Sequence, residues 1–169
     1  MKFPLFISSI GGVGFFPVAP GTFGSIVSFV GFLLFFKLNF SLYFLEIFLS
    51  LIFTIGWIAS HYALKENNFK NLDPSFIVID ECAGVWLGGI ILAYFYPFNW
   101  FLYTIYFLLF RFFDIYKIGP IKWADTYFKR NNNTAAFGVM ADDLLAGLVA
   151  ALVCGTFANL IDLKIWSDN

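Results

Sequence analysis

The amino-acid sequence predicts an all-α fold, a polytopic membrane bundle of about five hydrophobic helices. Three observations support this fold class. Hydrophobic residues make up 60% of the 169-residue chain, whereas soluble domains contain about 45–50%. Charged residues contribute only 12%, and a soluble chain of this length has too much surface to bury so many apolar side chains. The apolar residues are also gathered in five separate blocks.

The five hydrophobic blocks follow one another along the chain. They run over residues 22–36, 41–64, 82–96, 98–110 and 144–161. A hydrocarbon core of about 30 Å needs about 20 helical residues at about 1.5 Å each, and the second and fifth blocks come close to this unaided. The other three blocks must extend into flanking residues, tilt, or thin the bilayer. We therefore expect residues 1–169 to form a single integral membrane domain.

The basic residues predict which helix ends face the cytoplasm. If the N-terminus is cytoplasmic and all five blocks span the membrane, residues 1–21, 65–81 and 111–143 lie on the cytoplasmic side. These segments hold eight of the ten Lys and Arg residues, as the positive-inside rule requires. The net charge of −1 gives no general attraction to polyanions. We therefore expect a multi-pass protein with cytoplasmic polar loops that binds no nucleic acid.

Small residues recur at four-residue spacing in two of the blocks. Gly84 and Gly88 lie in the third block, and Gly147 and Ala151 lie in the fifth. Such pairs let helix backbones approach one another closely. The pattern predicts tight helix packing and carries no function by itself.

A glycine-rich segment, residues 11–25, leads into the first block. Its glycines would expose backbone N–H groups to an anion, and a helix start adds unpaired donors and a positive dipole. The hydroxyls of Thr22 and Ser25 could either cap the helix or hydrogen-bond a phosphate. The candidate phosphate-binding residues are therefore Gly21, Thr22, Gly24 and Ser25, and an ordinary re-entrant turn with an N-cap is the alternative.

Three further polar clusters carry five acidic residues. They are Asp80 with Glu81, Asp114 between Arg111 and Lys117, and Asp142 with Asp143. An acid at a helix N-terminus can simply stabilise the helix dipole, although one acid would be enough for that. If the fourth helix continues here, Arg111, Asp114 and Lys117 lie three residues apart, close to one face. They can form a ladder of salt bridges, or a phosphate clamp beside a metal ligand.

The predicted topology brings all four clusters to the same membrane face. Five carboxylates close together repel one another unless cations neutralise them. Oxygen ligands suit a hard ion such as Mg²⁺, and Mg²⁺ beside Arg111, Lys117 and an amide-rich loop indicates phosphoryl chemistry. The single histidine, His61, lies within a predicted helix, so lipid phosphatases that need two histidines are excluded. Attack by water with the help of a metal remains.

These clusters resemble the motifs of the phosphatidylglycerophosphatase A family, small Mg²⁺-dependent membrane phosphatases of bacteria. The family's opening pattern, Gly-x-Gly-x-x-Pro-x-Ala-Pro-Gly-Thr-x-Gly-Ser, is matched in full by residues 12–25. Its Asp-Glu-x-x-Gly, Phe-Arg-x-Phe-Asp-x-x-Lys and Gly-x-Met-x-Asp-Asp-x-x-Ala-Gly patterns are similar to residues 80–84, 110–117 and 138–147. Order and spacing agree over nearly the whole chain.

The resemblance implies Mg²⁺-dependent hydrolysis of phosphatidylglycerophosphate to phosphatidylglycerol and phosphate, a step of phospholipid biosynthesis at the bacterial cytoplasmic (inner) membrane. It implies an active site that faces the cytoplasm. The expected metal ligands are Asp80, Glu81, Asp114, Asp142 and Asp143, and the expected catalytic residues are Asp114, Asp143, Arg111 and Lys117. Asp114 would be either a further metal ligand or the general base. Arg111 and Lys117 would neutralise the phosphoryl oxygens.

A cation or proton transporter that uses clustered intramembrane carboxylates is the alternative function, because buried acids also mark ion pathways. A transporter needs polar groups that continue to the far side of the membrane. The far half of the predicted bundle is almost purely apolar, with Glu46 as the main exception. A purely structural subunit would not explain two acid pairs at helix ends. Phosphate release from lipid, with and without EDTA, discriminates between these functions.

Overall fold

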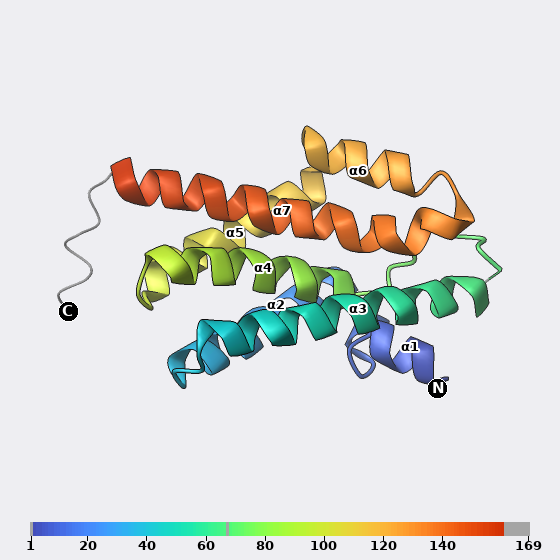
Figure 1. The fold of residues 1–169 in the computed structure, drawn as a ribbon. Helices are drawn as coiled ribbons and strands as arrows, with labels where there is room; N and C mark the ends of the chain where they lie inside the picture. Colours follow the sequence, from blue (N-terminus) through green and yellow to red (C-terminus); the bar gives the residue numbers. More distant parts are fainter. Residues whose placement is uncertain (1, 67, 161–169) are drawn as a thin grey trace.

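Seven α-helices and one 3₁₀ turn make up the computed structural model, which describes residues 2–66 and 68–160 (Figure 1). They are α1 (Phe3–Ser8), η1 (Val13–Phe15), α2 (Pro20–Lys37), α3 (Leu42–Glu66), α4 (Ile79–Phe95), α5 (Trp100–Tyr116), α6 (Pro120–Phe128) and α7 (Asn132–Leu160). The five longest helices cover most of the five predicted blocks. Residues 41, 96, 98 and 99 lie just outside these helices, and residue 161 lies outside the described residues. The all-α prediction is confirmed, and α1 and α6 are additional helices that the sequence did not predict.

Helices α2, α3 and α7 are long and apolar enough to cross a membrane. Helices α4 and α5 contain 17 residues each, so each spans about 25 Å at about 1.5 Å per residue. Large apolar side chains are exposed on the outside of the bundle, for example Leu51, Ile55 and Ile58 on α3. A surface of this kind fits contact with lipid chains rather than with water.

Helix α4 is the centre of the bundle and packs against α7, α2, α3 and α5. Two buried side chains form hydrogen bonds between α4 and its neighbours. The indole N–H of Trp86 donates to the carbonyl oxygen of Ser28 on α2 at 3.1 Å. The hydroxyl of Tyr106 on α5 donates to the carbonyl oxygen of Val85 at 2.8 Å. Both rings are almost fully buried, so the position of α4 is fixed from two sides.

Helices α4 and α7 cross at backbone contact, which confirms the tight packing that the small residues predict. A Cβ atom added to Gly84 would lie 2.4 Å from the carbonyl oxygen of Asp143. One added to Gly147 would lie 2.1 Å from the carbonyl oxygen of Gly84, and one added to Gly88 would lie 2.4 Å from that of Gly147. Because no side chain separates the two backbones, the acidic residues of α4 and α7 are brought close together.

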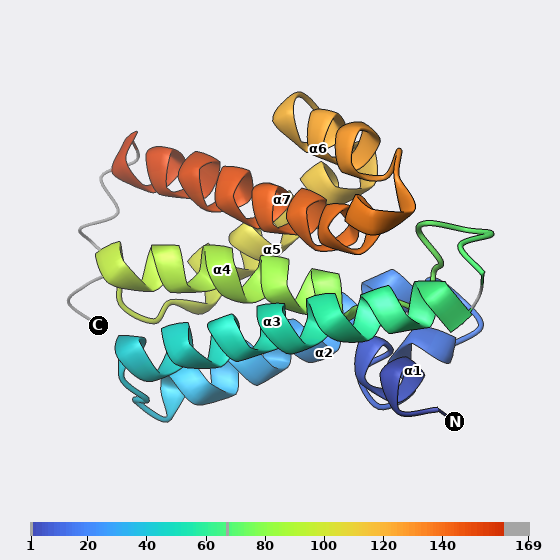
Figure 2. The ribbon, with the colours of Figure 1, turned by 45° about the vertical axis from the view of Figure 1, so that its right-hand side comes forward.

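The polar segments gather at one end of the bundle. In both views, α3 and α7 extend past the N-terminal end of α4, towards α1 and α6 (Figures 1 and 2). The N-terminal end of α2 points to this same end of the molecule. The first turn of α4 is therefore flanked by the longer helices α3 and α7.

A stripe of Arg111, Asp114 and Lys117 on one helix face would require α5 to include Lys117, but the helix ends one residue earlier. Arg111 and Asp114 lie on the helix, which ends at Tyr116, and Lys117 adopts a left-handed conformation with φ 45°. Pro120, in the first turn of α6, cannot continue the preceding helix. The side chain of Lys117 consequently leaves the stripe of Arg111 and Asp114 and turns towards α7.

Candidate active site

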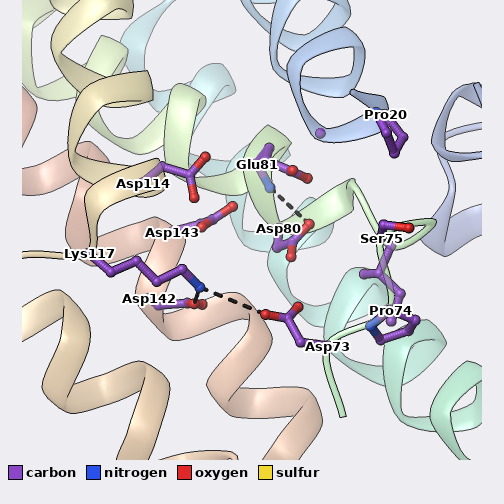
Figure 3. Close-up of a pocket in the computed structure, with 12 residues that line it drawn as sticks. Pro20, Asp73, Pro74, Ser75, Asp80, Glu81, Asp114, Lys117, Asp142 and Asp143 are labelled. Carbon is purple, nitrogen blue, oxygen red and sulfur yellow. Dashed lines mark hydrogen bonds and ion pairs between the residues drawn. The ribbon is translucent and has the colours of Figure 1, made fainter. Parts of the chain in front are cut away.

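A cavity of about 280 Å³ opens at the polar end of the bundle (Figure 3). Residues from α2, α4, α5, α7 and the loop that precedes α4 line this cavity. They are Pro20, Gly21, Asp73, Pro74, Ser75, Ile77, Asp80, Glu81, Asp114, Lys117, Asp142 and Asp143. Seven of the eleven residues that the sequence predicts for the site are among them. The other four, Thr22, Gly24, Ser25 and Arg111, do not line the cavity.

Asp80, Glu81 and Asp143 form a buried acidic triad. Asp80 and Glu81 lie in the first turn of α4, and Asp143 lies in α7. One carboxylate oxygen from each residue lies within 4.8 Å of the other two, and each residue is at most 9% exposed. No ion pair within the described part of the chain involves these three carboxylates. Buried carboxylates without a counter-ion are unfavourable, so the triad has the charge and the oxygen donors that a divalent cation needs.

The surroundings of Glu81 also fit a cation. Its Oε2 atom is buried and has no hydrogen-bond partner among the described residues. Its Oε1 atom lies so close to Gly21 that a Cβ atom there would be 2.3 Å away. The neighbouring Asp80 carboxylate accepts a hydrogen bond from the backbone N–H of Glu81 at 3.0 Å. Because Gly21 has no side chain, the Glu81 carboxylate can lie directly against the backbone of α2.

The glycines of residues 11–25 let this segment pack against the loop that enters α4. A Cβ atom on Gly14 would lie 1.9 Å from the carbonyl oxygen of Phe76. One on Gly24 would lie 2.7 Å from the side chain of Val78. These close approaches hold the start of α4, and with it the acids of its first turn, in a fixed position.

Thr22 and Ser25 hold the side chain of Arg111. The Nη1 atom of Arg111 donates to Ser25 Oγ at 2.8 Å, and its Nη2 atom donates to Thr22 Oγ1 at 3.3 Å. Nη1 also forms an ion pair with Asp114 on the same helix. The N-cap residue of α2 is Ala19, and no side chain caps that helix. The two hydroxyls therefore orient the guanidinium group, and the capping alternative is wrong.

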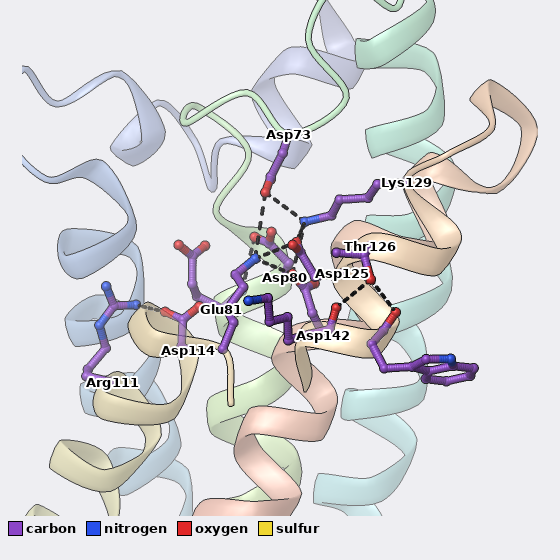
Figure 4. A network of polar contacts seen from close by, with 12 residues as sticks. Asp73, Asp80, Glu81, Arg111, Asp114, Asp125, Thr126, Lys129 and Asp142 are labelled. Atoms are coloured by element: carbon purple, nitrogen blue, oxygen red, sulfur yellow. Dashed lines mark hydrogen bonds and ion pairs between the residues drawn. The ribbon is translucent and has the colours of Figure 1, made fainter. Parts of the chain in front are cut away.

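A second group of acids lies beside the triad and surrounds two lysines (Figure 4). Carboxylate oxygens of Asp73, Asp125 and Asp142 lie within 4.8 Å of one another. Lys129 Nζ lies 2.7, 2.6 and 2.9 Å from these three carboxylates, respectively. Lys117 Nζ lies 3.8 Å from Asp73, 2.8 Å from Asp125, and forms an ion pair with Asp142. We call these five residues the lysine–aspartate cluster.

The lysine–aspartate cluster keeps its lysines charged. Burial alone lowers the pKa of Lys117 and of Lys129, but the carboxylate of Asp142 and its neighbours outweigh burial and raise both pKa values above that of an ordinary lysine. Burial alone raises the pKa of Asp125, but hydrogen bonds from both lysines hold that pKa well below its usual range. At neutral pH the cluster therefore contains two ammonium groups and an ionised Asp125.

Sequence reasoning missed Asp73, Asp125 and Lys129. Asp73 lies in the loop before α4, where no periodic pattern indicates its direction. Asp125 and Lys129 are four residues apart and form an i,i+4 ion pair, a spacing that marks neighbours on a helix. This spacing was the one available signal, and it depends on recognising α6, a helix of only nine residues.

Known proteins are similar in sequence to most of this chain. A protein of Escherichia coli named phosphatidylglycerophosphatase A is 32% identical over 153 residues, which cover 89% of this chain and 81% of the relative. A protein of the same name from Haemophilus influenzae is 34% identical over 152 residues, covering 89% and 86%. A protein of Bacteroides thetaiotaomicron, provisionally named a phosphatidylinositol-3-phosphatase, is 36% identical over 153 residues, covering 89% and 90%.

No solved structure matches the chain significantly. The family model described as phosphatidylglycerophosphatase A matches residues 6–158. This match spans the glycine-rich segment, the acidic triad and the lysine–aspartate cluster. The chain therefore belongs to the phosphatidylglycerophosphatase A family.

Proposed function

We propose that the protein is a membrane lipid phosphatase that hydrolyses phosphatidylglycerophosphate to phosphatidylglycerol and inorganic phosphate. The observation that carries this proposal is the buried acidic triad, which shares one cavity with Lys117 in a chain of this family. Carboxylates that hold a hard cation, next to positive groups for the phosphate oxygens, are what phosphomonoester hydrolysis requires. A polar cavity at one end of an apolar bundle also suits a lipid with an anionic head group.

Mg²⁺ is the proposed cofactor, with Asp80, Glu81 and Asp143 as its ligands. The triad offers carboxylate oxygens only, which suit a small hard ion, and the unpartnered Oε2 of Glu81 supports this fit. When bound, the ion would polarise the phosphoryl group and assist ionisation of water. Asp142, which the sequence also predicts as a ligand, gives Oδ2 to two lysines, while its Oδ1 has no partner among the described residues. Its ligation stays a prediction.

The remaining residues of the cavity, together with Arg111, which forms an ion pair with the cavity residue Asp114, are proposed to bind and orient the phosphate. Arg111, held by hydroxyl groups of α2, and Lys117 would neutralise the phosphoryl oxygens through charge-assisted hydrogen bonds. Asp114 lines the cavity and is the proposed acceptor of the proton from the attacking water. Gly21, which lines the cavity, is proposed to complete the phosphate site. Thr22 and Ser25 would contribute to it by orienting Arg111, and the phosphate-binding role of Gly24 stays a prediction.

The proposed location is the bacterial cytoplasmic membrane, with several spans and the cavity facing the cytoplasm. Three helices that could cross a membrane support a multi-pass arrangement. Eight of the ten basic residues lie in segments that belong to the end of the bundle with the cavity, which the positive-inside rule places in the cytoplasm. The main hydrophobic core, which lies around α4, supports one membrane domain, and a smaller core joins α3 to the start of α7.

Removal of the metal tests the proposal directly. In detergent micelles, the purified protein is expected to release phosphate from phosphatidylglycerophosphate, to lose this activity with EDTA, and to regain it with excess Mg²⁺. The physical reason is that the buried triad loses its counter-ion and the phosphoryl group loses its electrophilic assistance. Phosphate release that persists unchanged in EDTA would contradict a metal-dependent reaction.

Phosphatidylinositol 3-phosphate is a second candidate substrate, because one relative is provisionally named for that activity. The two lipids share a phosphomonoester and two acyl chains but differ in the head group. Values of kcat/KM for both lipids, measured in the same micelles, decide between them. We expect phosphatidylglycerophosphate to be preferred, and a higher kcat/KM for the inositol lipid would reverse the assignment.

Substitution of Arg111 by alanine is expected to raise the KM for the lipid by about 10- to 100-fold, with a smaller change in kcat. A hydrogen bond to a charged group contributes about 1.5–3 kcal/mol, and each 1.4 kcal/mol changes affinity about tenfold. Lys122→Ala is the control, because Lys122 is an exposed cation on α6 that forms no ion pair with a cavity acid among the described residues, whereas Arg111 pairs with Asp114. An unchanged KM in Arg111→Ala would remove the arginine from the phosphate site.

A further inference from the structure

The acidic triad and the acids of the lysine–aspartate cluster meet the same distance limit but differ in how their charge is balanced. In each group, oxygens from three carboxylates lie within 4.8 Å of one another. By donor type and spacing alone, either group could hold a divalent cation. The acidic triad has no ion-pair partner among the described residues, whereas the lysine–aspartate cluster contains two ammonium groups.

The lysines supply the charge that a divalent ion would supply. Two ammonium groups carry +2 against the −3 of three carboxylates. Lys129 lies within 2.9 Å of all three carboxylates, and its side chain is 11% exposed. A metal ion entering the cluster would have to displace two cations that are covalently tethered beside it. The ammonium groups are therefore placed to exclude a second ion.

The two lysines also differ in what they face. Lys117 lines the cavity, whereas Lys129 does not and approaches the same carboxylates from the end of α6. In sites with two metals, the second ion stabilises oxygens of the reacting phosphate. A lysine ammonium can do this as a point charge, provided that the carboxylates around it do not consume all of its hydrogen-bonding capacity. Lys129 shares those three carboxylates with Lys117.

We propose that Lys117 and Lys129 take the place of a second metal ion, so that the protein binds one divalent cation per chain. Lys129 is then a positioning residue that helps to neutralise the three aspartates and leaves Lys117 available to the substrate phosphate. This inference rests on the proposed function in placing the one ion at the acidic triad. It goes further in assigning the number of ions and the reason for that number.

Counting bound Mn²⁺ tests the inference. Mn²⁺ is a paramagnetic substitute for Mg²⁺ with the same preference for oxygen ligands. The full-length protein in detergent is expected to bind one Mn²⁺ per chain in equilibrium dialysis. The double variant Lys117→Met and Lys129→Met is expected to bind two, with magnetic coupling between the two ions in the electron paramagnetic resonance spectrum. Adding Asp125→Asn to the double variant should return the number to one.

The controls separate this inference from the proposed function. Lys122→Met removes an exposed lysine of α6 and should still bind one Mn²⁺. Two coupled ions in the wild-type protein would overturn the inference but leave the metal site at the triad intact. No bound ion in the wild type would overturn the metal assignment and the inference with it. One ion in a folded double variant would also overturn the role given to the lysines. If the double variant does not fold, the number of Mn²⁺ ions that the wild-type protein binds per chain tests the inference by itself.

Discussion

Replacing Asp80 by asparagine is expected to lower kcat/KM for phosphate release by at least about 10³-fold, which corresponds to about 4 kcal/mol of transition-state stabilisation. The substitution removes one negative charge from the buried triad and weakens the cation site, whose contribution is worth several kcal/mol. The fold should survive, because the Oδ1 atom of asparagine can still accept the hydrogen bond from the backbone N–H of Glu81. Initial rates and Mn²⁺ affinity should fall together, while the melting temperature stays nearly constant.

Glu46→Gln is the matched control for the loss of an acid. Glu46 lies on α3, outside the cavity, and accepts a hydrogen bond from the hydroxyl of Tyr94. Its replacement should leave phosphate release unchanged. Full activity in Asp80→Asn would remove Asp80 from the site. A loss of activity in Glu46→Gln would contradict a reaction confined to the cavity, and would favour a polar pathway across the bundle.

Gly147→Ala is expected to destabilise the protein by about 3 kcal/mol and to abolish activity. The new Cβ atom would lie 2.1 Å from the carbonyl oxygen of Gly84, and backbone atoms inside a packed helix pair cannot move aside locally. Overpacking of this kind costs about 1–3 kcal/mol, and a loss of about 3 kcal/mol corresponds to about 6–12 °C in melting temperature for a protein of this size. The two helices would have to separate, which would move Asp143 away from Asp80. Thermal unfolding in detergent and phosphate release measure the two effects.

Gly155→Ala, on the same helix, is the control for this substitution. A Cβ atom at Gly155 would lie 3.6 Å from the ring of Tyr96, which is ordinary contact. Alanine is a better helix former than glycine by up to about 1 kcal/mol, so this variant should be as stable as the wild type or slightly more stable. Equal destabilisation by the two substitutions would mean that the contact of α4 with α7 is not what limits stability.

The sequence alone predicted the parts of the fold that hydropathy determines. Each hydrophobic block became a long helix, and the distribution of basic residues indicated which helix ends lie together. This was sufficient to place Asp80, Glu81 and Asp143 around one cavity, although they come from distant parts of the chain. Gly84 and Gly147 were also recognised as packing residues, because small side chains at four-residue spacing let helix backbones approach closely.

The directions of the side chains at the site could not be predicted, because a sequence does not show what each of two adjacent acidic residues faces. Asp142 and Asp143 are neighbours on α7, but successive residues of a helix point about 100° apart, so one faces the lysines and the other the triad. The hydroxyl groups of Thr22 and Ser25 bind a guanidinium group from a helix about 90 residues away. No local pattern contains that partner. The left-handed conformation of Lys117, whose ammonium group pairs with Asp125, is likewise not marked by a local pattern.

The position of the first turn of α4 has a consequence for how the enzyme meets its substrate. Since α3 and α7 extend beyond that helix end (Figures 1 and 2), Asp80 and Glu81 do not lie at the outermost end of the bundle, and we expect the cavity to open at the depth of the lipid head groups. A lipid can then reach them by lateral diffusion without being lifted out of its leaflet. Turnover should consequently follow the mole fraction of substrate in the membrane surface, and diluting that surface with neutral lipid should slow the reaction even when the bulk concentration is constant.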